Sequence, residues 1–243
     1  MNTVEAIKHL FLDAGAGWVM WLLAGLSVGS FAIAFERWAL YRRTSGNLHE
    51  LAAGLQEKLA QGTEEKAAEW LLASNTVSSR VAAAGLRLAH RGAASASRAM
   101  ISRTALERED LERRLAYLGT LGNNAPFIGL FGTVIGVIQA FEELGHGAAG
   151  HAGAGAAGQV ASAAVMSAIA EALVATAVGI AVALPAVATY NYFQRRVEHL
   201  LSGAEVLSNL VLAHLESENI EVSPTPSSLS VASDSAASTV KEN

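Results

Sequence analysis

One acidic residue, Glu171, interrupts the apolar stretch that runs from about residue 160 to residue 194. A carboxylate at membrane depth is costly, so such residues usually face the interior of a helix bundle or a water-filled path. Burial disfavours the charged form of a carboxyl, which would let Glu171 gain and release a proton, and the predicted chemistry is a proton relay. The alternative is a permanently protonated Glu171 that hydrogen-bonds to a neighbouring helix. The number of residues in the segment allows two depths for Glu171, one near the outer margin of the membrane and one deeper.

Two threonines lie among small residues that predict close helix packing. Thr133 flanks a stripe of glycine and alanine at steps of three and four, where its hydroxyl could bond back to the carbonyl of Gly129 or face a polar interior. Thr176 belongs to a similar row in the third apolar segment. The residues expected to allow close helix contact are Gly129, Gly132, Gly136 and Gly179. Pro126 and Pro185 each remove a backbone donor, so both are expected to kink their helices.

Composition and motifs exclude several other chemistries. The chain has no cysteine and therefore no disulfide or thiol nucleophile, and it has no metalloprotease, serine-hydrolase or P-loop motif, so we expect neither an enzyme nor a cofactor. A net charge of −5 argues against nucleic-acid binding. His146 and His151 could hold a metal, but too few ligands stand near them, and no metal site is expected.

Three apolar segments must position these residues. The chain is 51% hydrophobic and 16% charged, which is too apolar for an ordinary soluble domain. Residues 14–35 and 115–141 contain no charge, and the third segment contains only Glu171, so each can form a spanning helix. We expect the first to be a retained anchor and not a cleaved signal peptide, because no small-residue cleavage site closes it.

Arginines near the ends of these segments predict the orientation. Ten lie on one side, against Lys8 on the other, and the side richer in Lys and Arg faces the cytoplasm. The ten are Arg37, Arg42, Arg43, Arg98, Arg103, Arg108, Arg113, Arg114, Arg195 and Arg196. The predicted fold class is an all-α membrane protein with three transmembrane helices and a periplasmic N-terminus.

The cytoplasmic parts are predicted to be helical. A leucine stripe from Leu48 to Leu59 indicates an amphipathic helix that stops at 61–63, and a second helix runs from Thr63 to a break at 74–76. With no turn signal before Gly119, the second span is expected to continue into the cytoplasm as one long helix. Apolar residues also continue at helical spacing past Arg195, so the third span is expected to extend as a helix beyond the membrane. A solvated surface helix with one buried side would explain the same spacing equally well.

The full division follows from these patterns. In the last segment, Ser, Thr and Pro make up 11 of 21 residues, which predicts disorder. The predicted segments are a periplasmic N-terminus (1–13), transmembrane helices (14–38, 115–142 and 161–194), a cytoplasmic helical domain (39–114), a periplasmic Gly/Ala/His loop (143–160), a cytoplasmic helix (195–222) and a disordered tail (223–243).

Two stretches carry a resemblance to a known family. They read Ala-Pro-Phe-Ile-Gly-Leu-Phe-Gly-Thr-Val at 125–134 and Ala-Glu-Ala-Leu-Val-Ala-Thr-Ala-Val-Gly at 170–179, and Pro-Ala-Val at 185–187 and Tyr-Asn at 190–191 follow them. They resemble the signature spans of the MotA/TolQ/ExbB proton-channel family. The expected three-span topology is similar to the ExbB and TolQ branch and unlike the four-span MotA branch, whereas residues 41–110 resemble nothing specifically.

The resemblance implies an inner-membrane pentamer whose second and third spans line a pore around two ExbD- or TolR-like single-span subunits with a membrane aspartate. It implies that Glu171 faces this pore, with Thr133 and Thr176 as polar lining. It also implies that proton flow drives a TonB-, TolA- or gliding-motility-type protein, and the sequence does not choose among these machines. The alternative from another class is a pentameric membrane scaffold with a structural Glu171 and no proton conduction.

Overall fold

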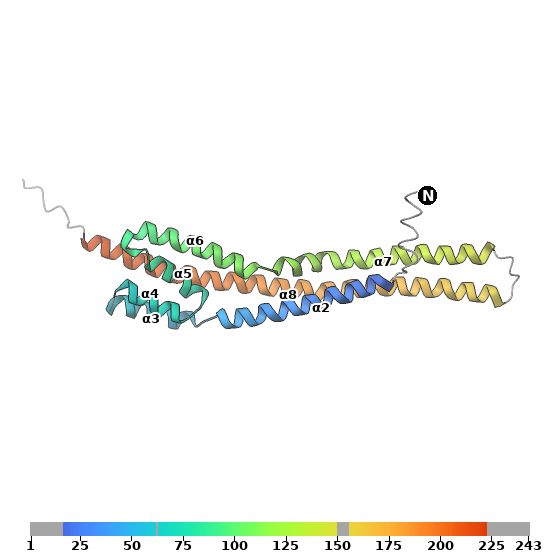
Figure 1. Ribbon diagram of the computed structural model, residues 1–243, viewed down its shortest axis with the longest axis horizontal. Helices are drawn as coiled ribbons and strands as arrows, with labels where there is room; N and C mark the ends of the chain where they lie inside the picture. The colour runs from blue at the N-terminus through green and yellow to red at the C-terminus, as the bar shows by residue number, and fades with distance from the viewer. Residues whose placement is uncertain (1–16, 62, 150–155, 223–243) are drawn as a thin grey trace, which may run out of the picture.

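The protein is an elongated, all-α molecule whose long helices lie side by side (Figure 1). The computed structural model describes residues 17–61, 63–149 and 156–222, and no strand occurs within these ranges. The helices are α2 (Gly17–Thr44), α3 (Leu48–Gln61), α4 (Glu64–Ala73), α5 (Val77–Leu86), the short 3-10 helix η1 (Ala89–Arg91), α6 (Ala93–Glu112), α7 (Leu115–Ala149) and α8 (Ala156–Val222). In one half of the molecule α2 and α7 lie along α8, and in the other half α3 to α6 pack against its second part (Figure 1).

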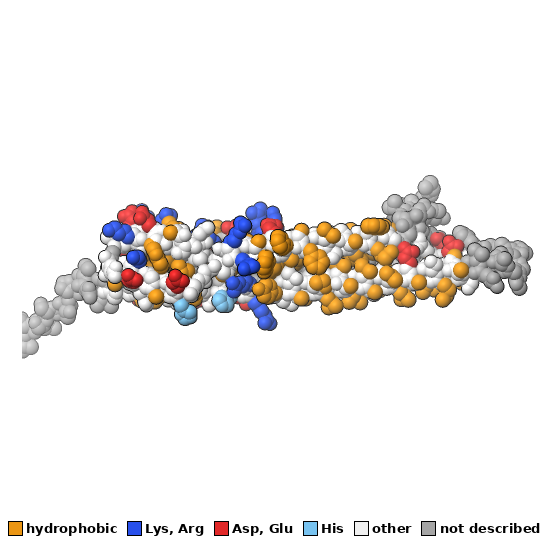
Figure 2. Space-filling model, turned by 90° about the horizontal axis from the view of Figure 1, so that it is seen from below, with side chains coloured by type: hydrophobic (Ala, Val, Ile, Leu, Met, Phe, Trp, Pro, Cys, Tyr) orange, Lys and Arg blue, Asp and Glu red, His pale blue; other side chains and the backbone are white. Residues whose placement is uncertain are grey.

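Helices α2, α7 and α8 include the three apolar segments, and each contains a stretch long and apolar enough to cross a membrane. Large apolar side chains point outward along this half: Trp21 is 81% exposed, Phe127 67% and Leu173 64%. An ordinary soluble surface does not expose a contiguous apolar area of this kind, which marks a surface for lipid or for other protein chains. Figure 2 shows the hydrophobic half and, at its boundary, a band of Lys and Arg side chains.

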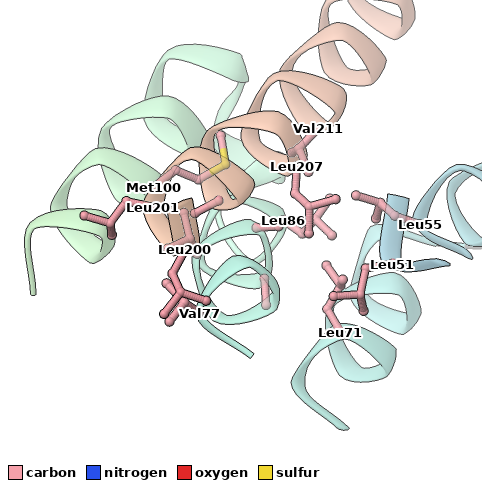
Figure 3. Packing of buried hydrophobic residues seen from close by; sticks show 14 of the residues in the cluster. Leu51, Leu55, Leu71, Val77, Leu86, Met100, Leu200, Leu201, Leu207 and Val211 are labelled. Carbon is pink, nitrogen blue, oxygen red and sulfur yellow. The ribbon is translucent and has the colours of Figure 1, made fainter. Parts of the chain in front are cut away.

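Helix α8 joins the two halves. Its 67 residues give a length of about 100 Å at 1.5 Å per residue. The expected continuation beyond Arg195 is confirmed, because the stripe at helical spacing is buried throughout, from Val197 at 0% exposure to Leu215 at 6%. Leu200, Leu207 and Val211 of this stripe meet side chains of α3 to α6 in one core (Figure 3).

The short helices follow the predicted stops and differ in one respect. Leu51, Leu55 and Leu59 form the buried stripe of α3, and both the end of α3 at Gln61 and the end of α4 at Ala73 agree with the predicted breaks. The sequence interpretation did not separate α5 from its surroundings. Thr76, taken there as part of a break, is the N-cap of α5, and its hydroxyl accepts a hydrogen bond from the backbone N–H of Ser79 in a reciprocal capping box.

The expectation that the second apolar segment continues toward the N-terminus as one long, unbroken helix is wrong. Helix α6 ends at Glu112, and α7 starts at Leu115 after Arg114, whose φ of 68° lies in the left-handed region. That conformation costs a non-glycine residue roughly 1–2 kcal/mol, so tertiary contacts must hold it. Arg114 forms an ion pair with Glu36 of α2, and the hydroxyl of Tyr41 donates a 2.7 Å hydrogen bond to the carbonyl of Leu111.

The range 143–160, expected to be a loop, is a second correction. Helix α7 reaches Ala149 and α8 begins at Ala156, so helix occupies most of it. The physical reason is its alanine content, since alanine has the highest helix propensity and offsets the neighbouring glycines. Residues 1–13 and the tail 223–243 lie outside the described residues.

A buried charge cluster fastens α5 to α6. The carboxylate of Glu107, 3% exposed, accepts a 2.7 Å hydrogen bond from Nε of Arg80 and a 2.5 Å hydrogen bond from Nη2 of Arg103. Burial by itself would raise the pKa of Glu107, but the hydrogen bonds and charges of Arg80 and then Arg103 outweigh burial and hold the pKa below its ordinary value. The charged form of Glu107 is therefore the one that the fold stabilises.

Candidate functional site

Helices α7 and α8 run antiparallel and approach closely along their small residues. A Cβ on Gly129 would lie 2.8 Å from the carbonyl oxygen of Ala175, and one on Gly179 would lie 2.7 Å from that of Ala125. Such distances leave no room for a side chain, so this seam depends on glycine at both positions.

The same seam continues toward the ends of the helices near residues 149 and 156. A Cβ on Gly132 would lie 2.8 Å from the Cβ of Ala175, and one on Gly136 would lie 2.5 Å from the Cβ of Ala172. All four glycines singled out from the sequence therefore lie in the α7–α8 contact. The polar residues Thr133, Glu171 and Thr176 therefore lie on two helices that pack closely against each other.

Pro126 and Pro185 lie inside α7 and α8, and both helices continue through them. Pro126 is flanked by Ala125, which is fully buried, so this turn lies in the seam. The expectation that the two prolines kink their helices stays a prediction.

Glu171 lies in α8 and is partly buried beside the start of α2. A Cβ on Gly17 would lie 3.2 Å from Oε1 of Glu171, which places the carboxylate against the first turn of α2. Within the described residues it forms no hydrogen bond or ion pair. A half-buried carboxylate without a fixed partner remains available to a proton donor or acceptor from water or from another chain.

The two threonines differ in how their hydroxyls are satisfied. Thr133 is partly exposed and donates a 2.6 Å hydrogen bond to the carbonyl of Leu130, so the acceptor is this carbonyl and not that of Gly129. The hydroxyl of Thr176 is buried and has no partner among the described residues. An unpaired buried hydroxyl is energetically unfavourable, and a water molecule or a polar group from another chain would relieve the cost.

Glu171 and Thr176 lie in different surroundings within one chain. Thr176 lies against Gly129 of α7, since a Cβ on Gly129 would be 3.0 Å from the Cα of Thr176, whereas Glu171 contacts α2. Five residues along an α-helix turn the side chain by about 140°, which separates the faces of Glu171 and Thr176. Any path that joins them must therefore include water or groups from other chains.

Sequence reasoning counted Arg37 as a boundary arginine and missed its structural role. It is 4% exposed and its Nη1 donates a 3.1 Å hydrogen bond to the carbonyl of Asp110, near the end of α6. Arg37 thus helps to fasten α2 to the break between α6 and α7. No local signal distinguishes it from the exposed arginines Arg42 and Arg43, because its burial depends on residues more than seventy positions away.

The histidines of the connection fall largely outside what the structure describes. His151 and the side chain of His146 are not among the described residues. In the part of the chain that is described, no three His, Asp or Glu side chains gather as they would around a metal ion.

Comparison with known proteins identifies relatives. The model of the MotA/TolQ/ExbB proton channel family matches residues 73–205. The Tol-Pal system protein TolQ of Pseudomonas aeruginosa is 43% identical over 110 residues, which is 45% of this chain and 42% of that protein. The biopolymer transport protein ExbB of Aquifex aeolicus is 36% identical over 106 residues, 44% of this chain and 64% of that protein.

A longer match is more distant. A putative biopolymer transport protein ExbB homolog of Methanothermobacter thermautotrophicus is 25% identical over 211 residues, 86% of this chain and 71% of that protein. The chain spans about two fifths to two thirds of the length of the TolQ and ExbB relatives named above. The family model includes Thr133, Thr176 and Glu171 within its matched range and covers more than half of the chain. The chain belongs to the MotA/TolQ/ExbB proton channel family, a family of membrane channels and not of enzymes.

Proposed function

We propose that this chain is the proton-channel subunit of an inner-membrane complex that uses the proton gradient to drive a periplasmic or cell-surface machine. The observation that carries the proposal is Glu171: a partly buried carboxylate in the apolar half of α8, without a partner among the described residues. Membership of a proton channel family supports Glu171 as the group that takes up and releases protons.

The boundary arginines support a periplasmic N-terminus and a cytoplasmic location for α3 to α6. Arg42, Arg43 and Arg195 are exposed, and Figure 2 shows a band of Lys and Arg side chains where the hydrophobic half ends. Positive side chains of short loops stay on the cytoplasmic side, so this end of α2, α7 and α8 faces the cytoplasm. Glu171 then lies toward the periplasmic end of its helix.

One acid cannot form a complete proton path, and this supports partner subunits. We infer single-span partners of the ExbD or TolR type, whose membrane aspartate would exchange protons with Glu171 through water. The unpaired hydroxyl of Thr176 and the partly exposed Thr133 would line the same water. The relatives named TolQ and ExbB favour a TolA- or TonB-type driven protein, and a gliding-motility machine is a further candidate.

The exposed apolar faces of α7 and α8 support a ring of several copies. Val134 of α7 is 51% exposed and Leu184 of α8 is 67% exposed, although both helices pack tightly against each other. Contact between neighbouring copies would cover such faces and enclose a central pore. We propose a pentamer, following the resemblance of the two signature helices.

The test is proton flux through the complex purified from native membranes with its partners and reconstituted into liposomes. Glu171→Gln keeps the size of the side chain and removes the titrating group, so we expect assembly to be intact and flux to fall to background. Glu143→Gln is the matched control, because Glu143 is an exposed acid on α7 and the chemical change is the same. Flux in the Glu143 variant should equal that of the wild type.

Full flux in the Glu171→Gln complex would refute the proton-relay role. A stable ring without flux in any variant would instead favour the alternative function, a membrane scaffold in which Glu171 is structural. Weighing the complex by native mass spectrometry gives the number of copies and the mass of each partner in the same preparation.

A further inference from the structure

A groove of about 670 Å³ lies between α2 and α8 near the end of the hydrophobic half. We call it the aromatic groove. Its walls are formed chiefly by Phe31, Phe35 and Trp38 of α2 and by Ala188, Tyr192 and Phe193 of α8. It is distinct from the α7–α8 seam and from Glu171, which lies at the opposite end of the shared length of α2 and α8.

The aromatic groove is open and apolar. Phe35 is 71% exposed, Tyr192 60% and Trp38 43%. Tryptophan and tyrosine concentrate at the boundary between hydrocarbon and lipid headgroups, where an apolar ring and a polar edge are both accommodated. Trp38 and Tyr192 are therefore of the residue types that suit the depth where a lipid acyl chain meets its headgroup.

Both walls of the groove end in an arginine. Helices α2 and α8 run in the same direction here, because Tyr41 packs edge-to-face against Phe193 with ring centroids 5.3 Å apart and, further along both helices, Arg196 donates a hydrogen bond to Ser45. On α2, one turn after Trp38, the guanidinium of Arg42 lies 4.8 Å from the centroid of the Trp38 ring.

The second arginine is Arg195, three residues after Tyr192 and so on the same face of α8. Both Arg42 and Arg195 are exposed, and neither forms an ion pair with a residue that the structure describes. The nearby acid Glu36 is paired with Arg114. The end of the groove thus carries two cations, and the exposed acid Glu198 follows one turn beyond Arg195 on α8.

We propose that the aromatic groove binds an anionic phospholipid, with an acyl chain along the aromatic walls and the phosphate between Arg42 and Arg195. This rests on the proposed orientation, which places the arginines in the cytoplasmic leaflet where anionic lipids attract clustered cations. The two arginines without an ion-pair partner favour an anionic lipid over an apolar helix from a second copy. Such a helix would cover the walls of the groove but would leave both arginines without an anion. Bound lipid would fasten α2 to α8 near the break between α6 and α7.

The test is native mass spectrometry of the purified complex in detergent, titrated with phosphatidylglycerol or with phosphatidylcholine. The wild type should bind phosphatidylglycerol in preference, and the double variant Arg42→Gln/Arg195→Gln should lose about thirtyfold in affinity for it, or roughly 2 kcal/mol for two cations. The matched control is Arg87→Gln/Arg98→Gln, which removes the same charge from exposed positions, one just after α5 and one on α6, and should bind as the wild type does.

A second variant tests the apolar part without touching the cations. Ala188 is an exposed residue of the groove, and Ala188→Trp should fill the groove and reduce phosphatidylglycerol binding even though both arginines remain. Equal binding of the two lipids, or unchanged binding in the double variant, would overturn the proposal. Disulfide cross-links between copies through Phe35→Cys and Tyr192→Cys would also overturn it, because they would show a second chain in the groove.

The lipid test is separable from the test of proton flux. The Glu171→Gln complex should bind phosphatidylglycerol as the wild type does, because Glu171 and the groove lie at opposite ends of the length that α2 and α8 share. Loss of flux with intact lipid binding, or the reverse, would therefore assign each failure to its own site.

Discussion

Replacing Gly179 with alanine is expected to weaken the α7–α8 seam. The new Cβ would lie 2.7 Å from the carbonyl oxygen of Ala125 and 3.0 Å from the Cα of Gly129. Both neighbours are backbone atoms of α7, so no rotation of a side chain can relieve the contact. The two helices would have to separate locally by about 0.7 Å to restore ordinary van der Waals contact, for which the lower limit is 3.4 Å.

The expected cost follows from that separation. A gap of 0.5–1 Å forfeits roughly a quarter to a half of the dispersion energy of each contact along the seam. Added volume in a tightly packed site costs about 1–3 kcal/mol. The intrinsic preference of a helix for alanine over glycine, about 1 kcal/mol, opposes this loss and must be measured separately.

Gly25→Ala supplies that measurement. Gly25 lies in α2 of the same hydrophobic half, and nothing lies within 4 Å of a Cβ placed on it. Comparing the two variants removes the propensity effect, so the Gly179 variant should be less stable than the Gly25 variant by about 1–3 kcal/mol. Thermal unfolding in detergent, followed by the fluorescence of the four tryptophans, should show a melting temperature lower by about 2–12 °C. Equal melting temperatures would refute the inference that glycine is required by close backbone approach.

Two further predictions concern single polar groups. Glu107→Gln should destabilise the fold by about 1.5–3 kcal/mol, because it removes the charge that Arg80 binds. Since the folded pKa of Glu107 is lowered, its contribution to stability is complete above the ordinary pKa of 4.5 and is lost as the pH falls through the folded value. Melting curves at graded pH should therefore converge for wild type and variant in acid, and a constant difference would contradict the assignment. Thr176→Val removes a hydroxyl that has no partner among the described residues, so the melting temperature should stay the same or rise while proton flux falls in part. A lower melting temperature would show that this hydroxyl has a partner in the assembled complex.

Local patterns predicted much of the fold. The three helices long and apolar enough to span a membrane follow from the length of uncharged sequence that a bilayer requires. The buried stripe of α8 beyond Arg195 follows from spacing alone. Glu171 could be singled out for the same reason, because a single acid in an apolar segment is visible without any structure. Each of these features depends on the transfer of side chains from water to an apolar phase. That transfer can be predicted locally, because the side chains involved are neighbours in sequence or lie on one helix face.

Contacts between distant residues decided the rest. No glycine or proline marks the break at Arg114 in the sequence. The ion pair of Arg114 with Glu36, which lies 78 positions earlier, stabilises the break. The burial of Arg37 and the aromatic groove likewise depend on which helix faces α2.

The sequence by itself determined that this chain has three segments long and apolar enough to span a membrane, a lone acid in the third and small residues along the second and third. Only the tertiary structure decided that Glu171 and Thr176 face different neighbours and that the hydroxyl of Thr176 is left without a partner among the described residues. The physical reason is that helix periodicity fixes the angle between two residues on one helix, whereas their environment depends on the helices packed around it. Proton transfer depends on that environment, so the sequence could name the residues and the structure was needed to show that one chain leaves them apart.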